Sequence, residues 1–64
     1  MIYLTRLNGD KFMLNIDLIE TVEETPDTVI TLTTGKKILV KESKRGIWDE
    51  IVKFRKIIYS NLKK

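Results

Sequence analysis

The chain has 64 residues, of which 42% are hydrophobic and 33% are charged, and its formal net charge at pH 7 is +3. It contains no cysteine and no histidine, which excludes disulfides, thiolate or imidazole metal sites and the common nucleophile–base pairs of enzymes. A domain of this size buries only about 60% of its unfolded surface. Burial against a partner or a second copy is therefore the remaining common route to extra stability.

The charge is unevenly distributed along the chain. Residues 1–42 carry five basic and seven acidic groups, a balance of −2, whereas residues 43–64 carry seven basic and two acidic groups, a balance of +5. An acidic or anionic partner is therefore expected to meet the C-terminal segment rather than the N-terminal one.

The N-terminal segment has the alternating pattern of a β-hairpin. Apolar residues recur with a period of two over residues 2–7, and residues 11–14 return as a second strand. The pair Asn8-Gly9 lies between them and favours a type I′ turn, in which both central residues have positive φ.

The middle of the chain predicts one helical turn and three further strands. Residues 15–19 are too few for another strand, and Asn15 or Asp17 is expected to cap a single turn there. Pro26 and Gly35 mark the two turns that follow. The strands are predicted over residues 20–25, 28–33 and 36–41.

These hairpins predict the fold class. An antiparallel sheet of about five short strands tends to curl into a small, half-open, barrel-like structure. We expect an α+β fold in a single domain, with this five-stranded curled sheet over about residues 1–42 and one C-terminal amphipathic helix over about residues 44–62.

The C-terminal segment has helical periodicity, with Ser43 as the expected N-cap. Trp48, Val52 and Tyr59 widen its apolar arc from roughly 80° to about 160°, and Arg55 lies among them. Core burial is the default for such a helix, but this arc is wider than a small sheet needs to cover, so we predict a partner interface or homo-oligomer contact at these four residues. The narrower stripe consists of Ile47, Ile51, Phe54, Ile58 and Leu62.

Four acidic residues lie close together in the sequence: Glu20, Glu23, Glu24 and Asp27. Without histidine and without the ordered spacing of a calcium loop, they are interpreted as a solvated strand face rather than a metal or acid–base site. We therefore expect no catalytic residue, no cofactor, no bound metal and no enzymatic activity.

A series of short segments is more specific than the composition. The string LTRLNG is followed by F and LN, then by DLIE, EETPDTVITL, GKK and VKES, from Met1 to about Ser43. This series resembles the FlbD/SwrD family of small flagellar and swarming-motility proteins. The resemblance implies a non-enzymatic bacterial protein that contacts a flagellar motor or basal-body-associated protein and supports motor or stator performance.

The opening MIYLTR also resembles the first strand of the carbon storage regulator family, in which the arginine closing that strand contacts RNA. Arg6 occupies this place. The rest of that family's pattern is missing, and an exposed arginine on an edge strand more often discourages aggregation. An RNA-binding regulator is therefore an alternative function, and under the main hypothesis we expect no nucleic-acid partner.

The basic helix supplies a second alternative, weak association with an anionic membrane surface, where each nearby cation contributes about 1 kcal/mol. A solvated cationic face is the competing interpretation. No apolar run approaches the roughly 20 residues needed to cross a bilayer. We accordingly expect a cytoplasmic protein, at most located at the inner face of the cell membrane.

Overall fold

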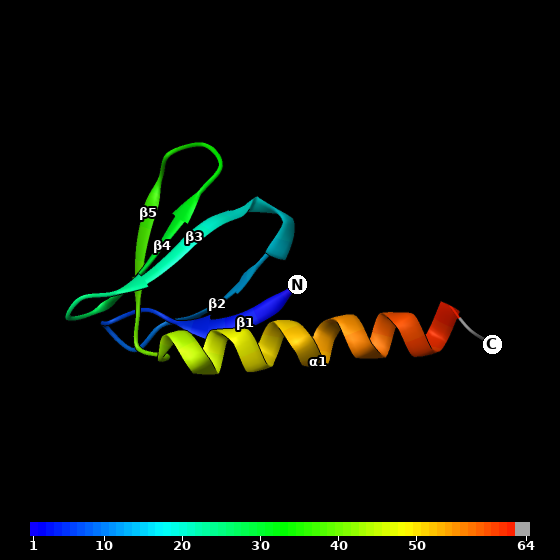
Figure 1. The fold of residues 1–64 in the computed structure, drawn as a ribbon. Helices are drawn as coiled ribbons and strands as arrows, with labels where there is room; N and C mark the ends of the chain where they lie inside the picture. The colour runs from blue at the N-terminus through cyan, green and yellow to red at the C-terminus, as the bar shows by residue number, and fades with distance from the viewer. Residues whose placement is uncertain (63–64) are drawn as a thin grey trace.

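The computed structural model describes the backbone of residues 1–62 and the side chains of residues 1–58. Figure 1 shows the helix running along the strands and continuing past them. The elements in chain order are β1 (Ile2–Thr5), β2 (Lys11–Leu14), the 3₁₀ turn η1 (Ile16–Leu18), β3 (Ile19–Glu24), β4 (Thr28–Leu32), β5 (Lys37–Val40) and α1 (Lys44–Leu62).

The strands form two antiparallel sheets, one of β1 and β2 and one in the order β3-β4-β5. The α+β class with a C-terminal helix is confirmed, but the prediction of one five-stranded, barrel-like sheet is wrong. One reason lies at η1, where the Asn15 side chain accepts a hydrogen bond from the Asp17 N–H at 3.0 Å. This capped turn redirects the chain after β2, so that β3 pairs with β4 but not with β2.

The two sheets meet at one corner. Arg6 forms an isolated antiparallel bridge with Val40, and the Lys41 N–H donates to the Thr5 carbonyl at 2.8 Å. The Thr5 N–H and hydroxyl both donate to the carboxylate of Glu42, at 2.9 and 2.8 Å. Because the Thr5 N–H donates to the Glu42 side chain, it is not available to a backbone carbonyl of the neighbouring strand. The pairing of β1 with β5 therefore stops there, and the two sheets do not close.

Two of the three hairpin turns, those joining β1 to β2 and β4 to β5, share one geometry built on a glycine. The Gly9 N–H donates to the Arg6 carbonyl at 2.9 Å, and the Gly35 N–H donates to the Leu32 carbonyl at 2.8 Å. Among the described residues, only these two glycines have positive φ, +98° and +92°. The predicted type I′ turn is wrong because Asn8 would also need positive φ. A three-residue loop with one left-handed glycine forms instead.

The core lies between the two sheets and the first half of α1. Strands β4 and β5 bury every second side chain, which gives each strand one core face and one outer face. Ile51 and Phe54 of the helix are half-buried against this core. The buried hydrophobic side chains are Ile2, Leu4, Leu14, Ile16, Ile30, Leu32, Ile38, Val40 and Ile47.

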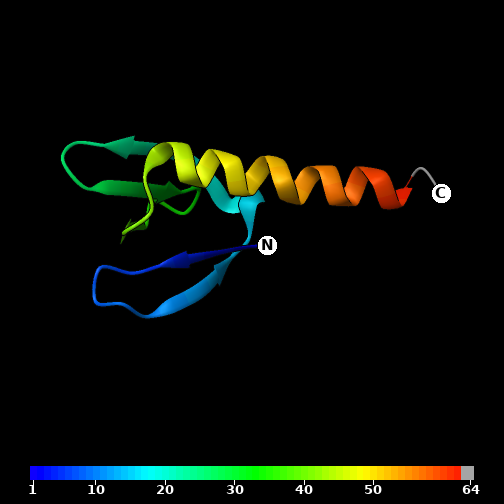
Figure 2. The same cartoon turned by 90° about the horizontal axis from the view of Figure 1, so that it is seen from below.

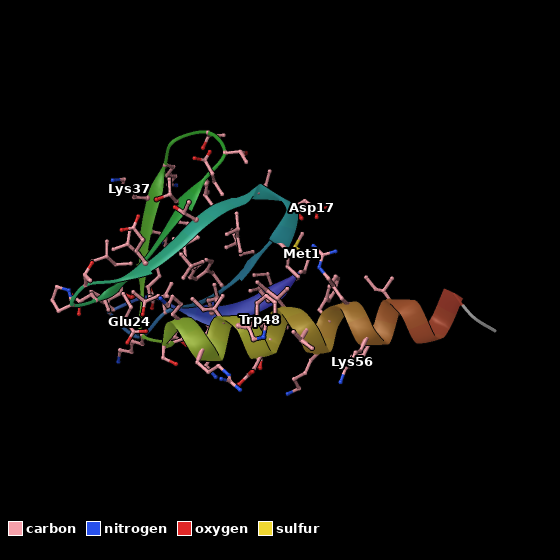
Figure 3. The ribbon with its side chains drawn as sticks, viewed as in Figure 1. Met1, Asp17, Glu24, Lys37, Trp48 and Lys56 are labelled. Carbon is pink, nitrogen blue, oxygen red and sulfur yellow. The ribbon has the colours of Figure 1, made fainter. Side chains whose placement is uncertain are left out.

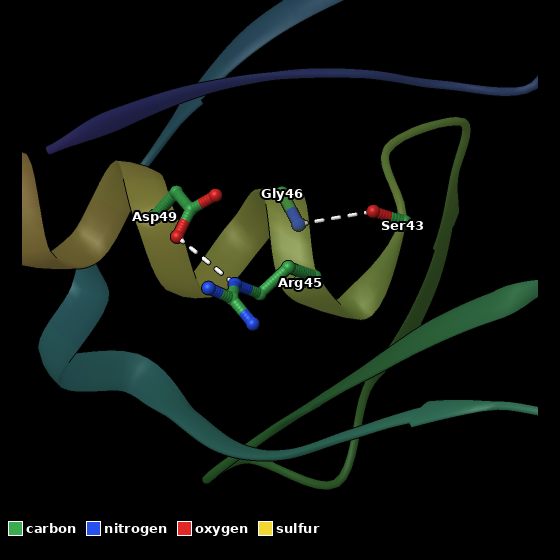
Figure 4. A network of polar contacts seen from close by, with 4 residues as sticks. All are labelled: Ser43, Arg45, Gly46 and Asp49. Atoms are coloured by element: carbon green, nitrogen blue, oxygen red, sulfur yellow. Dashed lines mark hydrogen bonds and ion pairs between the residues drawn. The ribbon is translucent and has the colours of Figure 1, made fainter.

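Side chains cap the start of α1. The Ser43 hydroxyl accepts a hydrogen bond from the Gly46 N–H at 3.0 Å, beside an ion pair within the first turns (Figure 4). The carboxylate of Glu24, at the end of β3, accepts from the Lys44 N–H at 2.6 Å. Both interactions satisfy free amides at the positive end of the helix dipole. The helix start is thereby fixed to the end of β3.

The helix is longer than the layer of strands that it covers. Its first half contacts β1 of one sheet and β3 of the other, and its second half projects past both sheets (Figures 1 and 2). The molecule is accordingly elongated, with extents of 41 × 23 × 19 Å. The apolar stripe is therefore buried at Ile47 but 42% exposed at Ile58.

Candidate functional site

The side chains predicted as a partner interface lie along one side of α1, and we call Trp48, Val52, Arg55 and Tyr59 the Trp48 surface. The Trp48 side chain is 60% exposed, Val52 is half-buried and Arg55 is exposed. Figure 3 shows Trp48 on the first half of the helix. The side chain of Tyr59 lies outside the described residues.

The Trp48 surface lies on the side of α1 where β3 begins. Arg55 Nη2 lies 3.7 Å from Oδ1 of Asp17, in the turn η1 that precedes β3. Seven residues of helix turn through roughly 700°, so Trp48 and Arg55 point in nearly the same direction. Both partners of this ion pair are mostly exposed, and such pairs contribute at most about 1 kcal/mol. The ion pair therefore adds little to the stability of the fold.

Trp48 contributes little to the core of this molecule. Its neighbour Ile47 is 1% exposed and is the residue through which the first turn of the helix enters the core. The indole of Trp48 instead presents a large apolar ring and one N–H donor to solvent, a combination that is enriched in protein–protein interfaces. That a partner covers this ring stays a prediction.

Arg6 lies at the corner between the two sheets rather than on a free edge. It is half-buried, its backbone pairs with Val40, and its guanidinium lies 4.4 Å from the centre of the Phe12 ring. The expectation of an exposed edge arginine is therefore wrong, because this cation–π contact holds the side chain against the hairpin. Its role as a nucleic-acid contact stays a prediction of the alternative function.

A family of known proteins shares the sequence pattern of this chain, which folds into two small sheets and one projecting helix. The family model of FlbD, flagellar and swarming motility proteins, matches residues 1–59. The chain belongs to the FlbD family. The match extends through the Trp48 surface, beyond the segments whose resemblance ended near Ser43. No curated protein and no solved structure shows significant similarity to the chain.

The acidic residues that lie close together in the sequence of this FlbD-family chain have different surroundings in the structure. Glu24 binds the N-terminus of α1, while Glu20 and Glu23 are exposed on β3. Within the described residues, no group of three acidic, histidine or cysteine side chains is placed to hold a metal ion. In the same part of the chain, no helix combines the length and apolarity that a membrane span requires.

Sequence reasoning missed the carboxylate of Glu42. Burial alone would raise its pKa, but hydrogen bonds from the backbone and hydroxyl of Thr5 outweigh burial, with help from the Glu42 backbone and the charge of Lys11. The pKa of Glu42 is therefore lowered from its ordinary value, which keeps the group ionised at neutral pH. This FlbD-family domain uses it as a clamp between β1 and β5. A single glutamate after a strand carries no sequence signal of that role.

A second exposed apolar patch on the FlbD-family domain was also missed. Tyr3 of β1 and Met13 of β2 are directly opposite each other in the hairpin, and both are exposed, as is Met1. The alternation that turns Ile2 and Leu4 inward places Tyr3 on the outer face, so the signal was present in the sequence.

Proposed function

We propose that this FlbD-family protein serves flagellar and swarming motility without catalysis, by binding a protein of the flagellar motor or basal body through the Trp48 surface. The family match supports the role in motility. The observation that carries the docking mode is the 60% exposure of Trp48 directly beside the buried Ile47. In this proposal the protein is an adaptor that supports motor or stator performance at the cytoplasmic face of the membrane.

The Trp48 surface suits an acidic partner. The segment from residue 43 onward carries the positive charge of the chain, and Arg55 can pair with a partner carboxylate in place of Asp17. Tryptophan and arginine dominate the energetics of many interfaces because they desolvate a large area and donate directional hydrogen bonds. Capping by Ser43 and Glu24 presents these side chains on a helix that is already ordered.

Replacing Trp48 with alanine is expected to weaken partner capture by about 30-fold or more, the effect of a typical interface hot spot. Stability should change little, because the ring is mostly exposed. The measurement is a pull-down from motile cells with tagged protein, followed by quantification of motor and basal-body proteins and by titration with the purified partner. Swarming of cells that carry the variant gives the functional readout.

The matched control is Leu39→Ala, which also removes an exposed apolar side chain but from the outer face of β5. Its capture and swarming should equal those of the unmodified protein. Undiminished capture by Trp48→Ala would show that the partner binds elsewhere. A variant that unfolds far more easily than Leu39→Ala would instead show that Trp48 belongs to the core.

A further inference from the structure

The turn between β1 and β2 contains the only Asn-Gly pair in the sequence. Asn8 and Gly9 are both exposed, and the turn lies at the end of the molecule opposite the projecting end of α1 (Figures 1 and 2). Asparagine is a thermolabile residue because the backbone nitrogen of the next residue can attack its carboxamide carbon. Glycine hinders this attack least, since it has no side chain. The pair is therefore a candidate for covalent change.

We propose that Asn8 is a site of spontaneous deamidation in the folded protein. The Gly9 nitrogen bonds to Cγ of Asn8, the bond from Cγ to Nδ2 breaks, and ammonia leaves with the proton of the Gly9 amide. The product is a five-membered succinimide ring. Water then adds across one of the two C–N bonds of the ring carbonyls, which yields either aspartate or isoaspartate. The reaction needs only water, and it does not depend on the function proposed above.

Two hydrogen bonds hold the carboxamide of Asn8 in position for this attack. Asn8 Oδ1 accepts from the Asp10 N–H at 2.9 Å, and the loop closed by this bond runs through the Gly9 nitrogen, which keeps Cγ beside the attacking atom. As the new bond forms, negative charge grows on Oδ1, where the Asp10 N–H already donates, as in an oxyanion hole. Asn8 Nδ2 donates to the Asp10 carboxylate at 3.2 Å, so the leaving nitrogen is also fixed.

The turn has room for the ring. A Cβ atom built on Gly9 would have no heavy atom within 4 Å, so neighbouring segments do not obstruct the closure. One contact opposes the reaction, because the Gly9 N–H donates to the Arg6 carbonyl at 2.9 Å and must be released before the nitrogen attacks. Release of a single exposed hydrogen bond slows the reaction by no more than about tenfold. The folded turn therefore still permits deamidation.

Asn15 is a matched comparison within the same chain. Its Oδ1 also accepts from the N–H two residues on, that of Asp17, at 3.0 Å. The residue that follows Asn15 is Ile16, which is β-branched and only 8% exposed. Its side chain shields the backbone nitrogen, and an attack by that nitrogen would disturb a packed core residue. We therefore expect Asn15 to stay intact although its carboxamide makes the same kind of hydrogen bond.

Deamidation of Asn8 is expected to loosen the turn. The new carboxylate lies beside that of Asp10, so repulsion replaces the contact made by Nδ2. Isoaspartate also adds one main-chain carbon to a loop whose closing bond joins Gly9 to Arg6. Because Arg6 forms the bridge with Val40, the change reaches the corner where the two sheets meet. A covalent change in an exposed turn thereby weakens the contact between the sheets.

The test compares the two asparagines in one sample. Folded protein is incubated at neutral pH and physiological temperature, then denatured and cleaved with trypsin. Cleavage after Arg6 and Lys11 places Asn8 in the peptide of residues 7–11 and Asn15 in that of residues 12–36. Mass spectrometry follows the mass gain of each peptide, and samples taken at the start give the background from digestion. Asn8 should convert at least about tenfold faster than Asn15, with isoaspartate among the products.

The variant Asn8→Gln is the matched control, because its longer side chain would have to close a six-membered ring. The peptide of residues 7–11 should then show no mass gain, while circular dichroism shows the variant folded. Deamidated protein, separated by its additional negative charge, should melt at a lower temperature than unmodified protein. Equal conversion of Asn8 and Asn15 would overturn the proposal, as would conversion of Asn8 only in urea. Conversion without isoaspartate would refute the ring, and unchanged melting would refute the loosened turn.

Discussion

Replacing Ile47 with alanine should lower the free energy of unfolding by about 2–5 kcal/mol, the usual cost of removing a large aliphatic side chain from a packed core. Ile47 is 1% exposed, and among the described helix side chains it is the one in the fully buried cluster. A 64-residue domain has a total stability of only about 3–10 kcal/mol. The variant is therefore expected to be partly unfolded at physiological temperature, as urea titration followed by circular dichroism would show.

Ile57→Ala is the matched control for Ile47→Ala, because it makes the same change in the same helix at a side chain that is 61% exposed. In dilute protein its stability should change by less than about 1 kcal/mol. Comparable losses in the two variants would contradict a helix that is anchored by its first turns. They would also remove the basis for treating the second half of α1 as separate from the core.

The second large effect is expected at Glu42, whose replacement by alanine should lower the free energy of unfolding at pH 7 by about 1.5–3 kcal/mol. The change leaves the Thr5 N–H and hydroxyl, both partly buried, without their acceptor. It also removes the side-chain contact that joins β1 to the segment after β5. Glu20→Ala, an exposed carboxylate of β3, should change stability by less than about 0.5 kcal/mol.

The contribution of Glu42 should depend on pH. Its folded-state pKa is lowered from the ordinary value of 4.5, so the unfolded chain takes up a proton first as the pH falls. The stabilisation is therefore fully present above pH 4.5 and is lost as the pH falls through the lowered folded-state pKa. The gap in unfolding free energy between the unmodified protein and Glu42→Ala should narrow in this acidic window. A gap that stayed constant would contradict an ionised clamp.

The sequence predicts those parts of the fold that depend on local pattern. Alternation places Ile38 and Val40 in the core, and a serine before an apolar helical repeat predicts the cap at Ser43. The separation into two sheets depends instead on contacts distant in sequence. Thr5 and Glu42 are 37 residues apart, and neither residue alone signals that their contact ends the pairing of β1 with β5.

The candidate surfaces were predictable to different degrees. The width of the apolar arc led to Trp48, which is largely exposed in the structure. Arg6 was placed on an edge strand, because the local sequence carries no signal of its contact with Phe12 across the hairpin. Ile58 was assigned to the core stripe with Ile47. A comparison of lengths would have corrected this, since 19 helical residues span about 28 Å while strands of four to six residues span only about 13–20 Å.

The projecting end of α1 has a consequence for how this chain tolerates change. Among the side chains that the structure describes, those of the helix contribute to the core only up to Phe54, so residues 55–58 can vary widely without harm to the core, provided that they remain helix formers. Evolutionary pressure on that stretch must therefore come from whatever the protein touches, and a mutational scan of those positions would record assembly separately from folding.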